Sequence, residues 1–116
     1  MDAEAIRDLF QELGAVRIRP MFGGKGIYLH DRMFVLVASD ELYLKVDHEN
    51  RAAFERAGSR PFVYRQGVKA VATSYWLMPE EGLEDPSEAA TWGRLALDAA
   101  SRAAARTKPK KNAQSR

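Results

Sequence analysis

Four short apolar runs, separated by small clusters of turn-forming residues, occupy residues 16–46 and constrain the fold more than any other feature. The runs are VRIRPMF, GIYLH, MFVLVA and LYLKV, and the clusters GGK, DR and SDE lie between them. Short runs rich in Val, Ile, Tyr and Phe between such breakers are typical of antiparallel strands joined by tight turns. We therefore predict an antiparallel meander. Residues 34–38, apolar on both faces, are its central strand, and Pro20 lies on an edge strand because proline has no N–H to donate.

The last run also predicts which face of the sheet is buried. Leu42, Leu44 and Val46 alternate with Tyr43 and Lys45. Since successive side chains of a strand point to opposite faces, one face is expected to be buried and the other wet.

Helical patterns flank and interrupt these strands. Apolar residues at i, i+3, i+4 and i+7 predict a first helix that is capped by Asp2 and stopped by Gly14. A short second helix opens at residues 47–48 and ends at Gly58, and a third begins at Asp85-Pro86. Residues 61–78 read as a hairpin whose long second arm bends near residues 73–74. The predicted fold is α+β: a two-layer sandwich with an antiparallel sheet and helices on one side, in the order α, β-meander, α, β-hairpin, α.

The length of 116 residues allows one domain, which we place at residues 1–106, followed by a basic flexible tail at 107–116. Residues 102–116 carry six basic and no acidic side chains; of the 18 basic and 16 acidic residues in total, 12 and 16 remain in residues 1–101. The expected body is therefore acidic (12 − 16 = −4) and the tail basic (+6). With no cysteine and no long apolar run, we expect a cytoplasmic protein without membrane contact.

The glycine-rich stretch FGGKG resembles a phosphate-binding loop only superficially. Such a loop needs Ser or Thr after its lysine and must open a helix, whereas Lys25 is followed by glycine and a strand-like run. We predict a hairpin turn with Lys25 exposed at its tip. The two histidines, the serines of the sheet region and the acids at residues 80–85 form no catalytic or metal-binding pattern, so we expect no enzyme activity, no cofactor and no metal.

Aromatic and basic residues suggest binding instead. Tyr75 and Trp76 are adjacent on a strand and must point to opposite faces, which leaves open whether they are core residues or meet a partner. Basic and aromatic residues are also interleaved from Arg17 to Tyr28, as on an RNA-binding sheet, although no RNP-type octapeptide is present. The candidate partner-binding residues are Arg19, Phe22, Lys25, Tyr28, Tyr75 and Trp76.

An ordered set of motifs runs through residues 3–105: Met21-Phe22-Gly23-Gly24, the run LYLKVD ending at Asp47, Ser74-Tyr75-Trp76, Pro79, Asp85 and Trp92. Taken in this order, the motifs resemble the N-terminal domain of the TfoX/Sxy family. One departure is Ala72-Thr73, where the family pattern has a methionine near SYW.

The resemblance implies an α+β domain of a family named for regulators of natural competence. Those regulators are thought to act with the cyclic-AMP receptor protein at promoters and carry a second, helical C-terminal domain. The family offers no catalytic residues to carry over. We therefore expect a non-enzymatic binding or regulatory protein that contacts a protein partner and is able to form a homodimer. Two alternatives stay open: a nucleic-acid-associated module that uses the basic tail and the Arg17/Arg19/Lys25 edge, and an undetected enzyme or binder of a small ligand.

Overall fold

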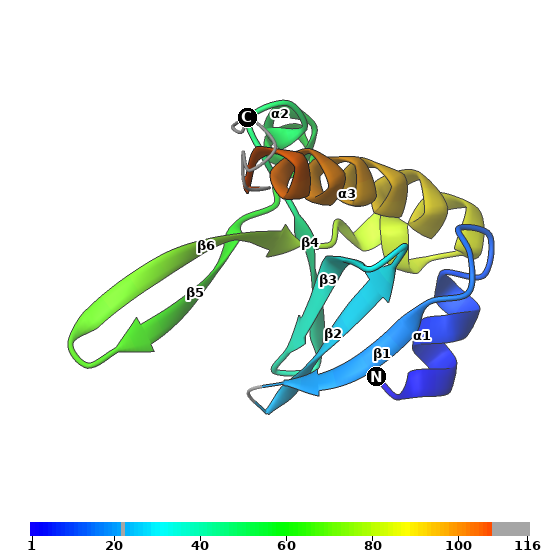
Figure 1. Cartoon of the computed structure of the whole chain (residues 1–116), viewed down its shortest axis with the longest axis horizontal. Helices are drawn as coiled ribbons and strands as arrows, with labels where there is room; N and C mark the ends of the chain where they lie inside the picture. The colour runs from blue at the N-terminus through cyan, green and yellow to red at the C-terminus, as the bar shows by residue number, and fades with distance from the viewer. Residues whose placement is uncertain (22, 108–116) are drawn as a thin grey trace, which may run out of the picture.

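Six antiparallel strands form a single sheet in the order β1-β2-β3-β4-β6-β5 in the computed structural model of the protein (Figure 1). The structure describes residues 1–21 and 23–107. Within these residues, three α-helices and one 3₁₀ helix complete an α+β fold, as predicted. The elements in chain order are α1 (Ala3–Leu9), β1 (Arg17–Met21), β2 (Gly24–Leu29), β3 (Arg32–Ala38), β4 (Glu41–Lys45), α2 (Arg51–Arg56), β5 (Pro61–Gln66), β6 (Lys69–Leu77), η1 (Glu80–Leu83) and α3 (Pro86–Thr107).

The predicted meander is present as β1 to β4, with β1 at the sheet edge and β3 inside the sheet. The turn after β2 lies at His30-Asp31 and the turn after β3 at Ser39-Asp40, and all four residues have positive φ angles. Two successive residues with φ > 0 are typical of the two-residue turns that match the twist of a hairpin.

The predicted position of Lys25 at a turn tip is wrong. Gly24, Lys25 and Gly26 belong to β2, and Lys25 is half-buried opposite Val37 of β3. The turn is shorter than the glycine cluster because Gly24 lies in β2, where it packs against the backbone of β3. A Cβ atom on Gly24 would lie 2.0 Å from the backbone oxygen of Val37, so β2 and β3 approach each other more closely here than any side chain permits.

A β-bulge in the middle of the sheet directs two adjacent side chains into the core. Ile27 pairs with Val35 and Tyr28 with Met33, which leaves Phe34 as an extra residue on β3. Phe34 and Val35 both have no exposed surface. The Phe34 ring packs edge-on against Phe10, with 5.6 Å between the ring centroids. The bulge therefore adds an aromatic anchor for the segment that follows α1.

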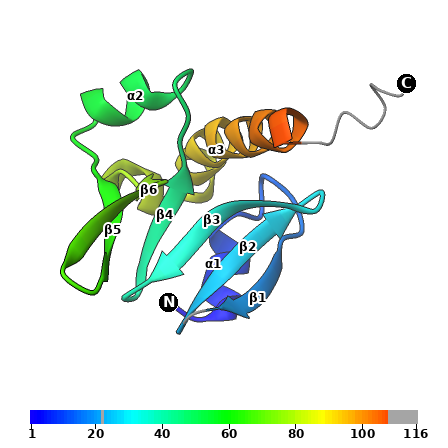
Figure 2. The same cartoon turned by 60° about the vertical axis from the view of Figure 1, so that its left-hand side comes forward.

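The helices cover one face of the sheet, and α1 and α3 begin where the sequence predicts, whereas α2 begins at Arg51, after the predicted opening at residues 47–48. Asp2 accepts a hydrogen bond from the N–H of Ala5, and Asp85 accepts one from the N–H of Glu88, so both act as N-caps. Helix α1 ends at Leu9, earlier than its apolar stripe predicts, and residues 10–13 continue as turns. In Figure 2, α1 and α3 lie behind the β1–β4 part of the sheet. Within residues 1–21 and 23–107, no helix combines the length and apolar character needed to cross a membrane.

Helix α3 is tied to the end of β4 by a nearly buried ion pair. Arg102 donates from Nε and Nη2 to the two carboxylate oxygens of Asp47, at 2.7 and 3.0 Å. Asp47 also accepts from the backbone N–H groups of Glu49 and Asn50. The hydrogen bonds from Arg102 outweigh the opposing effect of burial, and with the two backbone donors they lower the pKa of Asp47 to about 2. Arg102, which the sequence places in a basic segment, is thus a structural residue.

This ion pair predicts an acid-dependent loss of stability. The pKa of Asp47 is lower in the folded chain than its ordinary value of 3.8, so its contribution is present above pH 4 and lost as the pH falls towards 2. Arg102 is 30% exposed, so we expect about 1–2 kcal/mol, after allowing for solvent screening. Urea unfolding between pH 5 and 2 should show this loss in the wild type and not in Asp47→Asn. An equally steep loss in both proteins would contradict the assignment.

The second hairpin reaches away from the rest of the molecule (Figure 1). Its strand β6 pairs with β4 next to the core, and β5 forms the outer edge. The register shifts between Pro61–Trp76 and Val63–Ala72, so the ladder is irregular where the sequence predicts a bend near residues 73–74. The Thr73 hydroxyl donates to the carbonyl of Phe62 at the shift, so it satisfies a backbone group that the irregular ladder leaves unpaired.

Candidate binding face

The sheet face that points away from α1 and α3 carries tyrosine and basic side chains, and neither helix covers it (Figure 2). Arg17 is the register partner of Tyr28, and Lys45 is the register partner of Tyr75, so each pair shares a face. The next pair along, Leu44 and Trp76, lies on the helix side and is buried. We call the following set the tyrosine–arginine face: Arg17, Arg19, Tyr28, Lys45 and Tyr75.

The tyrosine rings hold the cationic groups in place. The guanidinium carbons of Arg17 and Arg19 lie 5.7 and 5.9 Å from the centre of the Tyr28 ring. The Lys45 ammonium lies 5.2 Å from the centre of the Tyr75 ring. At partly exposed sites each such contact contributes about 0.5–1 kcal/mol, enough to favour one side-chain arrangement. The cations are therefore partly ordered before any partner binds.

Two further hydrogen bonds fix the Lys45–Tyr75 pair. Lys45 Nζ donates to the Ser74 hydroxyl at 2.7 Å, and the Tyr75 hydroxyl donates to the Met33 carbonyl at 3.3 Å. Burial, assisted by the neighbouring Tyr28, raises the pKa of Tyr75 to about 12, so its phenol stays neutral. Burial and the charge of Arg106 lower the pKa of Lys45, while Asp47 opposes them. The pair is thus held by its neighbours on three strands.

The charge of this face is opposite to that of the acidic body. Arg17 forms an ion pair with Asp31 at 3.5 Å, in which both side chains are more than half exposed. Neither Arg19 nor Lys45 has a carboxylate within ion-pair distance among the described residues. An exposed ion pair contributes little, so even Arg17 remains available to an external anion.

The structure brings together three of the six residues predicted from sequence: Arg19, Tyr28 and Tyr75. Lys25 is three positions before Tyr28 on β2. Its side chain therefore lies on the helix side of the sheet, opposite to Arg19 and Tyr28. Trp76 is also on the helix side, 9% exposed, with the Arg51 guanidinium 5.3 Å from its ring centre. Phe22 lies outside the described residues, as do residues 108–116 of the predicted basic tail; Thr107, which the sequence assigns to that tail, ends α3.

Sequence reasoning missed Lys45 as a site residue. Its alternation with Leu44 and Val46 does place it on the wet face. Its proximity to Tyr75 depends on the pairing of β4 with β6, which are separated along the chain by α2 and β5. No local pattern encodes that pairing.

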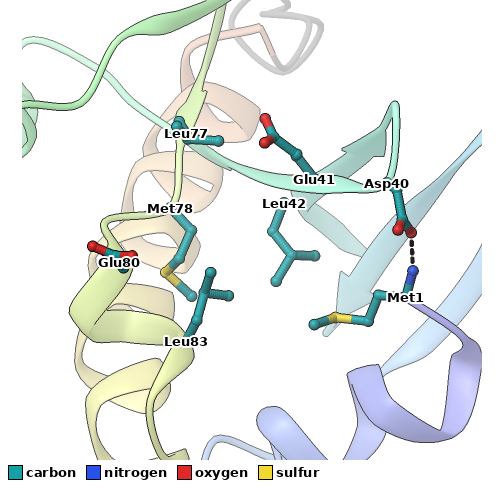
Figure 3. A pocket seen from close by; sticks show the side chains of 8 residues that line it. All are labelled: Met1, Asp40, Glu41, Leu42, Leu77, Met78, Glu80 and Leu83. Carbon is teal, nitrogen blue, oxygen red and sulfur yellow. Dashed lines mark hydrogen bonds and ion pairs between the residues drawn. The ribbon is translucent and has the colours of Figure 1, made fainter.

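A separate hollow of about 420 Å³ lies between the start of β4, the end of β6 and η1. Figure 3 shows Leu42, Met78 and Leu83 converging on it, with the Met1 amino group paired to Asp40 at one side. Its other lining residues are Glu41, Leu77 and Glu80. None of its lining residues is Ser, His or Lys. The described residues also contain no group of three or more potential metal ligands.

Comparison with known proteins agrees with the motifs. Residues 8–100 match the model of the TfoX N-terminal domain family. A relative in Aliivibrio fischeri, DNA transformation protein TfoX1, is 31% identical over 77 residues. The match covers 66% of this chain and 37% of that protein, so the chain spans well under half of the relative's length.

Proposed function

This chain belongs to the TfoX N-terminal domain family, and from that premise we propose that it is a non-enzymatic binding module that takes part in regulating DNA transformation. It acts through protein–protein contacts, and the tyrosine–arginine face is its contact surface. The single observation that carries this proposal is the stacking of Arg17 and Arg19 on Tyr28, on a face that the helices leave uncovered.

The chemistry of the face supports an acidic protein partner. Tyrosine and arginine are the residues that dominate binding energy at protein interfaces, because both give a large contact area and directional hydrogen bonds. Ordering of the guanidinium groups on the ring lowers the entropy lost on binding. A carboxylate from the partner would find two pre-positioned guanidinium groups on β1, and a second carboxylate could reach the Lys45 ammonium on β4, across β2 and β3.

The non-enzymatic part of the proposal rests on the chemistry of the polar groups. Tyr75 donates to a backbone carbonyl and Lys45 to a serine hydroxyl, so both groups already have structural partners. The 420 Å³ hollow is lined by apolar side chains, carboxylates and the amino group of Met1. The structural partners of Lys45 and Tyr75 and the lining of the hollow support a binding role.

A capture experiment tests the proposal with charge reversals of equal size. The immobilised full chain, the Arg17→Glu/Arg19→Glu variant and an Arg56→Glu/Arg94→Glu control are incubated with nuclease-treated extract of the source cells. Arg56 and Arg94 are exposed and lie on α2 and α3, outside the tyrosine–arginine face. The wild type and the control should retain acidic proteins. The face variant should retain about tenfold less of them, which corresponds to a loss of roughly 1.4 kcal/mol of binding free energy. Equal retention by all three chains would contradict the proposal.

A further inference from the structure

The distal part of the β5–β6 hairpin, residues 63–72, is a two-stranded ribbon that projects from the body (Figure 1). We call it the arm. All of its residues except Val71 are exposed, and Val68, beside the turn glycine Gly67, is 97% exposed. Val63 and Tyr64 are also exposed, at 48% and 42%. An isolated two-stranded ribbon is only marginally stable in water, so an extended arm of this kind gains from an external surface against which it packs.

The charge of the arm identifies the kind of surface. Between Glu55 and Glu80 the chain contains no acidic residue, although the whole sequence has 16. The same stretch contains four basic residues, of which Arg65 and Lys69 lie in the arm and Arg56 and Arg60 precede it. None of these four forms an ion pair within residues 1–21 and 23–107. The arm is therefore suited to a polyanion.

The register of the ribbon selects among polyanions. Arg65 pairs with Ala70 and Gln66 pairs with Lys69, so Arg65 and Lys69 occupy neighbouring rungs and lie on opposite faces of the ribbon. A flat acidic protein surface would meet only one of these faces. A groove of duplex DNA has a phosphate backbone on each wall, and the major groove, about 12 Å wide, admits a two-stranded ribbon.

We propose that the arm enters a groove of duplex DNA tip-first, with Arg65 and Lys69 on opposite phosphate walls and Val68 towards the groove floor. Gln66 on the last rung before the turn can hydrogen-bond base edges, for which glutamine has suitable donors and acceptors. This surface is separate from the tyrosine–arginine face. The proposal goes beyond protein contact: the same domain binds DNA with the arm and a protein with the sheet.

Fluorescence anisotropy with a labelled duplex of about 20 base pairs tests the proposal. The wild-type full chain, Arg65→Gln/Lys69→Gln and the control Arg7→Gln/Arg94→Gln are titrated at several salt concentrations. Both variants lose two positive charges and retain residues 108–116. Removing two phosphate contacts should lower the slope of log Kobs against log salt by about 1.8, and the affinity by about tenfold at low salt, relative to the control.

Two outcomes would overturn the proposal. One is an equal loss of affinity in the arm variant and the control, because net charge alone would then explain it. The other is that a polyglutamate peptide competes with the duplex at equal charge, since a groove is then not needed.

A further variant, Val68→Glu, tests tip-first entry. It places a carboxylate at the tip and should weaken duplex binding by more than tenfold without changing the circular dichroism spectrum. Unchanged binding would exclude tip-first entry. These variants leave Arg17 and Arg19 intact. A loss of DNA binding in them therefore does not affect the test of protein binding, and the two proposals are tested separately.

Discussion

Replacement of Gly24 by alanine is expected to lower the free energy of unfolding by about 3 kcal/mol or more, which is a large part of the stability of a small domain. The added Cβ would lie 2.0 Å from the Val37 carbonyl oxygen and 3.1 Å from its carbonyl carbon. Both atoms belong to the backbone of the central strand β3, so relief of the clash must open the β2–β3 ladder. Urea unfolding monitored by circular dichroism measures the change.

The matched control is Gly67→Ala in the turn of the arm. Gly67 has φ +66° and no atom within 4 Å of an added Cβ, so only the backbone conformation is strained. We expect a loss of about 1 kcal/mol from this left-handed geometry. A Gly24→Ala variant no less stable than the Gly67→Ala variant would show that β2 and β3 are not packed as closely as described.

Replacement of Phe54 by alanine should destabilise the protein by about 4 kcal/mol, as is typical for removal of a fully buried aromatic ring. Phe54 has no exposed surface, and its ring packs edge-on against Trp92 with 5.0 Å between centroids. This contact joins α2 to α3. Phe54→Leu keeps most of the volume and should cost less than about 1.5 kcal/mol. Equal losses in the two variants, measured by urea unfolding, would contradict a packing role for the ring.

Local patterns predict the elements of this fold well because each rests on nearby residues. The Asp2 and Asp85 caps, the stop at Gly58 and the bend at Thr73 all involve contacts within a few positions along the chain or across one hairpin. The misplacement of Lys25 has an equally local cause. A shift of one residue in the position of a turn changes the face on which the following side chains of the strand lie.

The sequence indicates only part of the tyrosine–arginine face because that face depends on pairing between distant segments. Arg17, Arg19 and Tyr28 lie on one hairpin, and their interleaved pattern is visible in the sequence. Tyr75 and Lys45 meet because β6, and not β5, pairs with β4. Either strand of a hairpin can join a sheet edge, and the choice depends on the total packing of the core. The sequence pattern therefore indicates a basic and aromatic surface without showing which residues complete it.

The central claim is that a protein partner binds the tyrosine–arginine face, and fluorine NMR of the chain labelled with 3-fluorotyrosine tests it most directly. The chain contains four tyrosines: Tyr28 and Tyr75 on this face, Tyr43 buried and Tyr64 on the arm. Titration with the partner recovered in the capture experiment should shift or broaden the signals of Tyr28 and Tyr75 and leave that of Tyr64 unchanged. A change confined to Tyr64, or signals of Tyr28 and Tyr75 that do not move at saturation, would contradict it.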